Sequence, residues 1–271
     1  NYMLFFTQKG KCYWLKVYEI PEGAKNSKGR AIQNMLNIDA DDKVNAFIRV
    51  KQLQDPEYNM SHNLLFCTRK GVIKKTKLEA YSRPRQNGVN AITIREDDQV
   101  IQVRLTTGDS QIIMANKHGR AIRFHESTVR EMGRTATGVR GMTLDETGDD
   151  EVIGMICIKD PEKETVMVVS EQGYGKRSEI GDYRITNRGG KGVKTLNITE
   201  KTGNLVAIKS VTDENDLVII NKSGITLRMK VADVRIMGRA TQGVRLINLE
   251  KRNDEIASVC KVLSETESDS S

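Results

Sequence analysis

The sequence lacks the features that mark membrane proteins and zinc proteins. It has no apolar run long enough to cross a membrane, and it shows no secretory leader. Its four cysteines form no Cys-x-x-Cys pair and have no histidine pair nearby, which argues against a zinc site. We therefore expect Cys12, Cys67, Cys157 and Cys260 to be small buried apolar residues of a protein from a reducing compartment.

Groups for catalysis are also scarce. The three histidines, His62, His118 and His125, have neither metal-ligand nor catalytic spacing, and no Ser, His and Asp set gathers near one loop. The Gly-rich run Arg188–Gly192 is not a nucleotide-binding loop, because that motif needs glycine where Val193 stands. We expect no catalytic residue, no metal and no cofactor in this chain.

The charge is moderately basic. The 271 residues carry a formal charge of +7, and removing the three acids of the last nine residues, LSETESDSS, raises it to +10. A sequence pI near 9.1 suits a polyanionic partner such as nucleic acid or anionic lipid, although many proteins are mildly basic without one. The chain does not begin with methionine and opens on an apparent strand, which suggests a piece of something longer.

An internal repeat organises the chain. Gln111–Leu144 and Leu217–Leu249 share one pattern at a constant offset of 105 residues. Two glycines mark each of five copies, and they are Gly10 and Gly29, Gly71 and Gly88, Gly119 and Gly138, Gly173 and Gly192, and Gly224 and Gly243. A period of about 50 residues indicates a propeller, a solenoid or an array of stacked units.

Each copy reads as four short strands. In the last copy we predict strands over Leu217–Ile220, from Ile225, over Gly243–Leu249 and over Ile256–Val262, with Gly224 in the hairpin turn where positive φ is needed. In the first copy the predicted strands are Tyr2–Thr7, Lys11–Val17, Arg30–Ile38 and Lys43–Val50.

Four strands per repeat predict an all-β fold of propeller-like blades, five of them visible, with a linear array that does not close as the alternative. We assign residues 1–262 to this domain and 263–271 to an acidic, Ser-rich tail that we expect to be disordered. Gln52–His62, which contains Pro56 and Asn59, is the expected flexible linker.

Cations recur at matching places in the copies. The fourth position after the first glycine holds Trp14, Lys75, Arg123, Arg177 and Arg228, and two residues further stand Lys16, Lys77, His125, Glu179 and Lys230. The second position after the second glycine holds Arg140, Lys194 and Arg245 in the last three copies, but Ala31 and Asn90 in the first two. We interpret the recurring cations as an outward belt for a phosphate backbone; ordinary solvation of exposed strands is the alternative.

The Gly-rich run is a second candidate for an anion contact. Its glycines let backbone N–H groups approach an anion, and Arg188 and Lys191 supply charge. A plain Gly-rich turn that opens the next strand is an equal alternative.

Several runs resemble the C-terminal domain of bacterial DNA gyrase A, which is part of a type IIA topoisomerase. They are Tyr13–Pro21 with Ser27–Ile32, Lys74–Thr76, Gly138–Gly141, Gly173–Arg177 and Gly238–Val244. The corresponding C-terminal domain of topoisomerase IV is a less similar relative. The resemblance covers residues 1 to 262 and adds Lys28, Arg30, Lys74 and Lys176 to the candidate DNA-binding residues.

The resemblance implies a β-pinwheel of up to six blades that exchange outer strands and wrap double-stranded DNA around a basic perimeter. The domain then presents a DNA segment to the rest of gyrase A and to gyrase B, where ATP, Mg²⁺ and the catalytic tyrosine act in negative supercoiling. It implies no catalysis by this chain alone, an isolated domain that is monomeric, and a bacterial cytoplasmic, nucleoid-associated location without membrane contact.

One departure concerns the family's box, Q-[RK]-R-G-G-K-G, which belongs to a blade that would precede residue 1. Arg188–Gly192 copies most of it, but in the fourth copy. We therefore expect phosphate contact from Arg188 and Lys191 without the wrapping role of the box. A propeller-type protein-interaction module is the alternative function, which salt-insensitive binding would favour.

Overall fold

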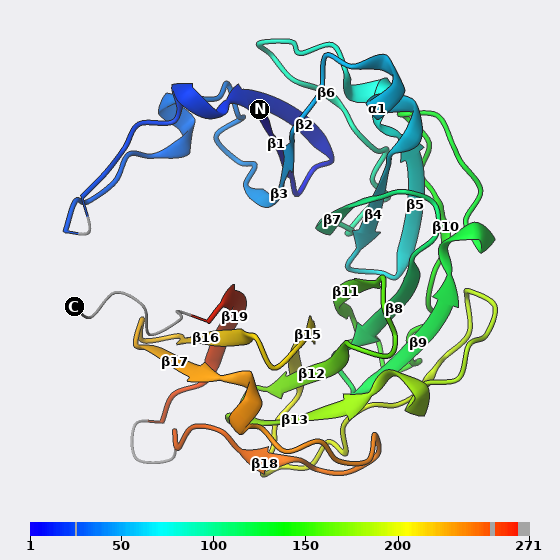
Figure 1. Cartoon of the computed structure of the whole chain (residues 1–271), viewed down its shortest axis with the longest axis vertical. Coiled ribbons are helices and arrows are strands. Elements are labelled where there is room, and N and C mark those ends of the chain that lie inside the picture. Colours follow the sequence, from blue (N-terminus) through cyan, green and yellow to red (C-terminus); the bar gives the residue numbers. More distant parts are fainter. Residues whose placement is uncertain (25, 250–252, 265–271) are drawn as a thin grey trace. The chain divides into compact units, whose positions relative to one another are not determined.

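The computed structural model describes residues 1–24, 26–249 and 253–264 (Figure 1). Within these residues the chain is almost wholly β, as predicted, with one short α-helix. The first two sheets, in strand order, are β3 (Val44–Val50), β1 (Tyr2–Thr7), β2 (Lys11–Lys16) and β6 (Val89–Asn90), and then β10 (Val139–Arg140), β5 (Val72–Lys77), β4 (Asn63–Thr68) and β7 (Val100–Thr106).

Two further sheets follow the same plan, and the last sheet has three strands among the described residues. They are β11 (Val152–Ile158), β8 (Gln111–Asn116), β9 (Arg120–His125) and β14 (Val193–Lys194); β15 (Leu205–Val211), β12 (Thr165–Ser170), β13 (Tyr174–Glu179) and β18 (Val244–Arg245); and β17 (Thr226–Lys230), β16 (Asn215–Asn221) and β19 (Ile256–Leu263). All the pairings between these strands are antiparallel.

A single-turn 3₁₀ helix follows the second hairpin strand of each repeat. These helices are η1 (Val17–Glu19), η3 (Leu78–Tyr81), η4 (Glu126–Thr128), η5 (Ile180–Asp182) and η6 (Val231–Asp233). The ten marker glycines all have positive φ, between 67° and 102°, which confirms the prediction made for Gly224 and extends it to the other nine.

The outer strand of each four-stranded sheet comes from the next repeat. It is only two residues long: β6 pairs with β2, β10 with β5, β14 with β9 and β18 with β13. This exchange is the one that the resemblance implies. The longer third strands predicted over Arg30–Ile38 and Gly243–Leu249 are wrong, because only β18 forms in the second range and η2 (Ile32–Asn34) occupies the first.

Two compact units make up the chain. The first contains residues 1–110 and 126–141, so it takes a segment of the third repeat. Its core includes Phe6, Phe66 and Tyr81, with the Phe6 and Phe66 rings 5.3 Å apart and edge to face. Aromatic pairs of this geometry add about 0.5–1.5 kcal/mol beyond their buried area.

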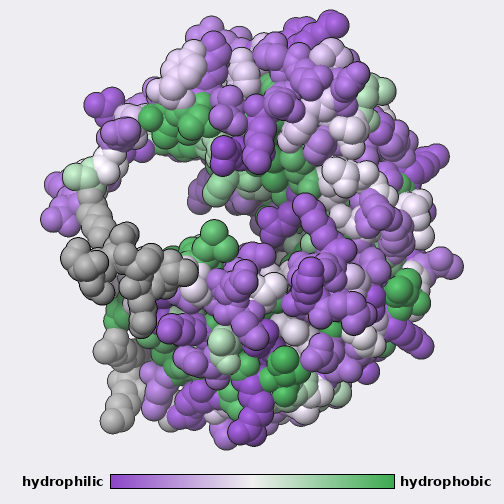
Figure 2. All heavy atoms as spheres, viewed as in Figure 1, coloured by the Kyte–Doolittle hydropathy of each residue, from purple (hydrophilic) through white to green (hydrophobic). Residues whose placement is uncertain are grey.

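The second unit contains residues 111–125 and 142–271. It has two apolar clusters, one around Ile113, Val168 and Leu196 and the other around Leu217 and Val259. Hydrophilic side chains dominate the faces of both units that are seen in Figure 2.

The segment Gln52–His62 is not the flexible linker that we expected. It forms α1 (Pro56–Ser61), whose N-terminus is capped when the Asp55 carboxylate accepts a hydrogen bond from the N–H of Glu57 at 3.0 Å. Asn59 is buried and donates from Nδ2 to the Leu53 carbonyl at 2.8 Å. Proline at the start of a helix and a side-chain cap explain the order of this segment.

The four cysteines differ in their burial. Cys12 and Cys67 are buried as predicted, but Cys157 is half-buried and Cys260 is exposed.

The predicted tail lies mostly outside the described residues, yet β19 extends through Leu263 and the Ser264 hydroxyl donates to Asp216 at 2.6 Å. Among the described residues, no helix combines the length and apolar character that crossing a membrane requires.

Candidate nucleic-acid interface

Three of the four cations in the predicted belt are buried. Lys75, Arg123 and Arg177 are only 6%, 8% and 4% exposed, and Trp14 occupies the same position in the first repeat at 8%. The prediction that this position faces outward is therefore wrong for these residues. Arg228, on the edge strand β17, is the exposed member.

The buried cations hold the next repeat in place. Arg123 donates to the carbonyl of Ile180, the first residue of η5, at 3.0 Å and to that of Tyr183, the residue at which η5 ends, at 2.8 Å. In the same way Lys75 donates to the Glu126 carbonyl at 3.1 Å, and Arg177 to the Val231 carbonyl at 3.3 Å. The recurring charge thus satisfies carbonyls at the joint between repeats, where a neutral apolar side chain would leave them unpaired.

Lys74 and Lys176, two further candidate DNA-binding residues, form a second buried row. Each is fully buried, and burial lowers the pKa of Lys74 to about 7 and that of Lys176 to about 8. The Lys74 ammonium donates to the Ala91 carbonyl at 2.5 Å and to the carbonyl of Arg134. Lys176 binds a turn of the fifth repeat through the carbonyls of Gly238 at 2.9 Å and Thr241 at 3.0 Å.

Exposed cations do recur on the exchanged outer strands. Arg140 on β10, Lys194 on β14 and Arg245 on β18 occupy the second position of their strands and are all exposed. The strands are too short to bury these side chains, and each lies at the outer edge of its sheet. This is the predicted recurrence at the second position after the second glycine.

The other candidate residues are scattered over the hairpins and the first connection. Lys28, Arg30 and Lys230 are exposed, and Lys16 lies 5.5 Å from the centre of the Tyr18 ring. Lys77 forms an ion pair with Glu131 at 3.0 Å.

A further exposed row was missed by the sequence reasoning. Arg130, Arg184 and Arg235 each stand eleven residues after the first glycine of their repeats, and each is exposed. The sequence contains the signal for this row, because the three arginines lie at the same distance from the first glycine of their repeats. Arg134 and Arg239 also recur but are clamps: Arg134 donates to the Asn90 carbonyl at 2.7 Å, and Arg239 from Nε to the Asp182 carbonyl at 3.0 Å.

The Gly-rich run borders a cationic cavity of about 550 Å³ in the second unit. The charged residues that line it are four arginines and a lysine: Arg120, Arg123, Arg184, Arg188 and Lys191. A cavity of one sign concentrates counter-ions of the other, so this site suits a phosphate group.

The backbone of the loop turns its carbonyls toward the protein. Thr143 donates from Oγ1 to the Gly189 carbonyl at 2.6 Å and from its N–H to the Gly190 carbonyl at 3.0 Å. Arg120 donates to the Gly192 carbonyl at 3.0 Å. A Cβ at residue 192 would lie 2.2 Å from the Ala121 carbonyl oxygen, so only glycine allows this approach to β9.

The fold and this surface define an all-β repeat protein that exchanges strands between repeats and presents exposed cations at equivalent positions of its outer strands. The chain belongs to the family described as DNA gyrase C-terminal domain, beta-propeller, whose model matches residues 1–51, 62–107, 110–159, 164–212 and 215–260. The family description thus contains the propeller that the sequence predicts.

The chain is similar in sequence to DNA gyrase A proteins. It is 45% identical to the DNA gyrase A protein of Staphylococcus aureus strain NCTC 8325 over 267 residues, which is 98% of this chain and 29% of that protein. With the gyrase A protein of strain MRSA252 the identity is 47% over 249 residues, covering 92% of this chain and 27% of that protein. The chain therefore spans less than a third of the length of these relatives.

Solved structures agree on the fold. A crystal structure of the C-terminal domain of DNA topoisomerase IV matches with a TM-score of 0.85 and 27% identity, over 97% of this chain and 79% of that one. A structure of a DNA gyrase A C-terminal domain matches with a TM-score of 0.82 and 25% identity, over 97% of this chain and 82% of that one. Sequence identity is higher to the two staphylococcal gyrase A proteins than to either of these.

Proposed function

We propose that this chain binds double-stranded DNA through its phosphates, without base-sequence specificity. The observation that carries the proposal is the recurrence of exposed cations at one position of the outer strand, Arg140, Lys194 and Arg245. Cations at an equivalent position of successive repeats suit the repetitive charge of a duplex, and contacts to phosphate position a protein on DNA without reading its bases.

The proposal extends to bending and to the parent enzyme. Bending 20–30 base pairs by 40–90° costs on the order of 1–6 kcal/mol, so several phosphate contacts must act together. Cations from successive repeats supply them, and the exposed Arg130, Arg184 and Arg235 form a second recurring set. As part of gyrase A, the domain would present its bound segment for ATP-dependent strand passage and negative supercoiling, together with gyrase B, in the bacterial cytoplasm at the nucleoid.

The test is the salt dependence of DNA binding. Each phosphate neutralised contributes about 0.9 to the negative slope of log K against log salt concentration. A triple variant, Arg140→Gln, Lys194→Gln and Arg245→Gln, removes three cations, so we expect the slope to shrink by about 2.7 if each binds one phosphate. Fluorescence anisotropy with a labelled duplex measures the slope, and ligation of nicked circles measures the bend.

A matched control removes the same charge from the opposite side of the sheets. Lys43 and Lys51 flank β3 and Lys159 follows β11, strands at the edges away from β6 and β14, and all three lysines are exposed. Their change to Gln leaves the slope nearly intact if the outer-strand row is the interface. An equal decrease of the slope in the two triple variants would mean that only the net charge matters. Binding that does not change with salt concentration would favour the protein-interaction module.

A further inference from the structure

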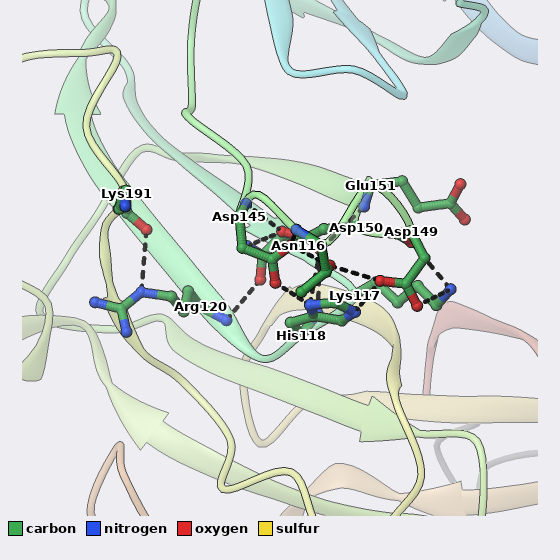
Figure 3. Close-up of polar contacts among 10 residues, drawn as sticks. Asn116, Lys117, His118, Arg120, Asp145, Asp149, Asp150, Glu151 and Lys191 are labelled. Carbon is green, nitrogen blue, oxygen red and sulfur yellow. Dashed lines mark hydrogen bonds and ion pairs between the residues drawn. The ribbon is translucent and has the colours of Figure 1, made fainter.

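The hairpin turn of the third repeat carries a cluster of metal-ligating groups that the DNA interface does not use. His118 stands in the turn between β8 and β9, and Asp145 and Asp149 stand in the loop that precedes β11 (Figure 3). The Nδ1 atom of His118 contacts Asp145, and Nε2 lies 3.2 Å from Oδ1 of Asp149. One atom from each of the three residues lies within 4.8 Å of the others.

A buried aspartate holds the turn and the loop together. Asp150 accepts hydrogen bonds from Nδ2 of Asn116 at 2.8 Å and from the N–H groups of Asp145 at 3.1 Å, Glu151 at 2.9 Å and His118 at 3.3 Å. These donors occupy its oxygens, so Asp150 positions the cluster and leaves the other two carboxylates to face the imidazole.

The same clamp recurs in the first two repeats, but with a lysine in place of the histidine. Asp42 accepts from the N–H of Lys9 at 3.1 Å, and Asp98 from the N–H of Lys70 at 2.9 Å. The Lys9 ammonium then pairs with Asp41. In those repeats a permanent cation sits before the turn glycine and offsets the acidic loop.

The third repeat has more acid and no such cation at that position. Lys117 is the lysine next to the cluster, with its Nζ 3.7 Å from Oδ2 of Asp149. The carboxylates of Asp145, Asp149 and Asp150 and the ammonium of Lys117 sum to a net charge of about −2 while the imidazole is neutral. A divalent cation matches such a charge.

The donor set selects the kind of ion. Imidazole nitrogen favours Zn²⁺, Co²⁺ and similar ions, whereas Mg²⁺ and Ca²⁺ prefer sites made of oxygen alone. Ligands about 2.0–2.1 Å from a tetrahedral zinc lie roughly 3.3 Å from one another. Asp149 has a side chain that is 64% exposed, so packing does not prevent it from approaching to that separation.

We propose that His118, Asp145 and Asp149 bind one divalent transition-metal ion of the Zn²⁺ type. One imidazole nitrogen and one oxygen of each carboxylate are the protein ligands, and water completes the coordination. The ion ties the turn of the β8–β9 hairpin to the loop before β11, in addition to the Asp150 clamp. This inference does not depend on DNA binding.

Titration of the metal-free chain with Zn²⁺ and with Co²⁺ tests the site. We expect one equivalent of Zn²⁺ by calorimetry, and Co²⁺ absorption in the visible without the near-ultraviolet band of a cobalt–thiolate bond, which separates this site from the exposed Cys260. His118→Gln weakens binding at least about tenfold. Gln172 stands at the equivalent turn position of the fourth repeat, so glutamine is compatible with the turn.

Two further variants make the outcome decisive. Asp149→Asn also weakens binding, whereas Asp41→Asn, in the acidic loop of the first repeat, leaves it unchanged. A chain that binds no Zn²⁺, binds it equally after His118→Gln, or releases it to a modest excess of Mg²⁺ would overturn the proposal. Circular dichroism and the unfolding midpoint show whether each variant is folded.

Discussion

The buried ammonium of Lys176 makes the stability of the chain depend on pH in a direction that can be tested. Its side chain is fully buried, and its hydrogen-bond partners are the carbonyls of Gly238, Arg239 and Thr241 and the hydroxyl of Thr241. Burial, and then the charge of Arg239, lower its pKa from 10.5 to about 8. These partners are all neutral groups, so none of them offsets the buried charge as a carboxylate would.

The size of the effect follows from the pKa difference. A shift of one pKa unit corresponds to about 1.4 kcal/mol, so a shift from 10.5 to about 8 corresponds to about 3 kcal/mol. Between these pH values the unfolded chain binds more protons at this lysine than the folded chain does, so stability rises with pH. Below pH 8 both states are protonated and the cost of the buried charge is fully present.

The assay compares the wild type with Lys176→Met, which keeps the length of the side chain and removes the titrating group. Urea unfolding at intervals from pH 7 to 10.5 gives the free energy of unfolding of each protein. We expect the wild type to gain about 3 kcal/mol relative to the variant across this range. Other titrating groups are common to both proteins and cancel in the difference.

The control is Lys230→Met, in which the lost ammonium is exposed. A difference between the wild type and Lys176→Met that stays constant with pH would show that the buried lysine keeps its ordinary pKa. A difference that falls with rising pH would mean that the ammonium is stabilised by its carbonyl partners, and the reasoning from burial would then be wrong.

Three other outcomes are expected. Gly192→Ala places a Cβ on a residue with positive φ and against the neighbouring strand, so we expect the free energy of urea unfolding to fall by about 3 to 4 kcal/mol. Gly29→Ala also has positive φ but open space around it, so its free energy of unfolding falls by about 1 kcal/mol. Glu126→Ala leaves the donors of its buried carboxylate unpaired and lowers the thermal midpoint, equivalent to about 1–3 kcal/mol; an unchanged midpoint would contradict that role. Iodoacetamide labels exposed Cys260 first, whereas Cys12, whose thiol pKa is raised by burial, reacts only on unfolding, as peptide mass spectrometry would show.

The repeated cations show how far the sequence pattern carries a functional prediction. Lys75, Arg123 and Arg177 recur at one position, and recurrence suggested a common partner. The partner is a set of carbonyls in the next repeat, because the inner strands of these sheets are buried on both faces. Alternation along a strand predicts two faces, but it does not show whether another segment covers the polar one.

The His118 cluster was beyond the sequence reasoning for a similar reason. Its acids lie 27 and 31 residues away, in a loop whose place depends on the Asp150 clamp. Histidine spacing along the chain holds no information on such a contact. Comparison of the turn residues Lys9, Lys70 and His118 would have indicated that the third repeat differs, but not what faces it.

The sequence alone determined the number of visible repeats, the all-β class and the two glycine turns of each repeat. These depend on local properties, since positive φ and hairpin turns are decided within a few residues. Tertiary structure decided the exchange of outer strands and the division of the cations into buried clamps and exposed contacts. Those outcomes depend on which segment of the next repeat packs on a strand, and that segment lies roughly 50 to 75 residues further along the chain.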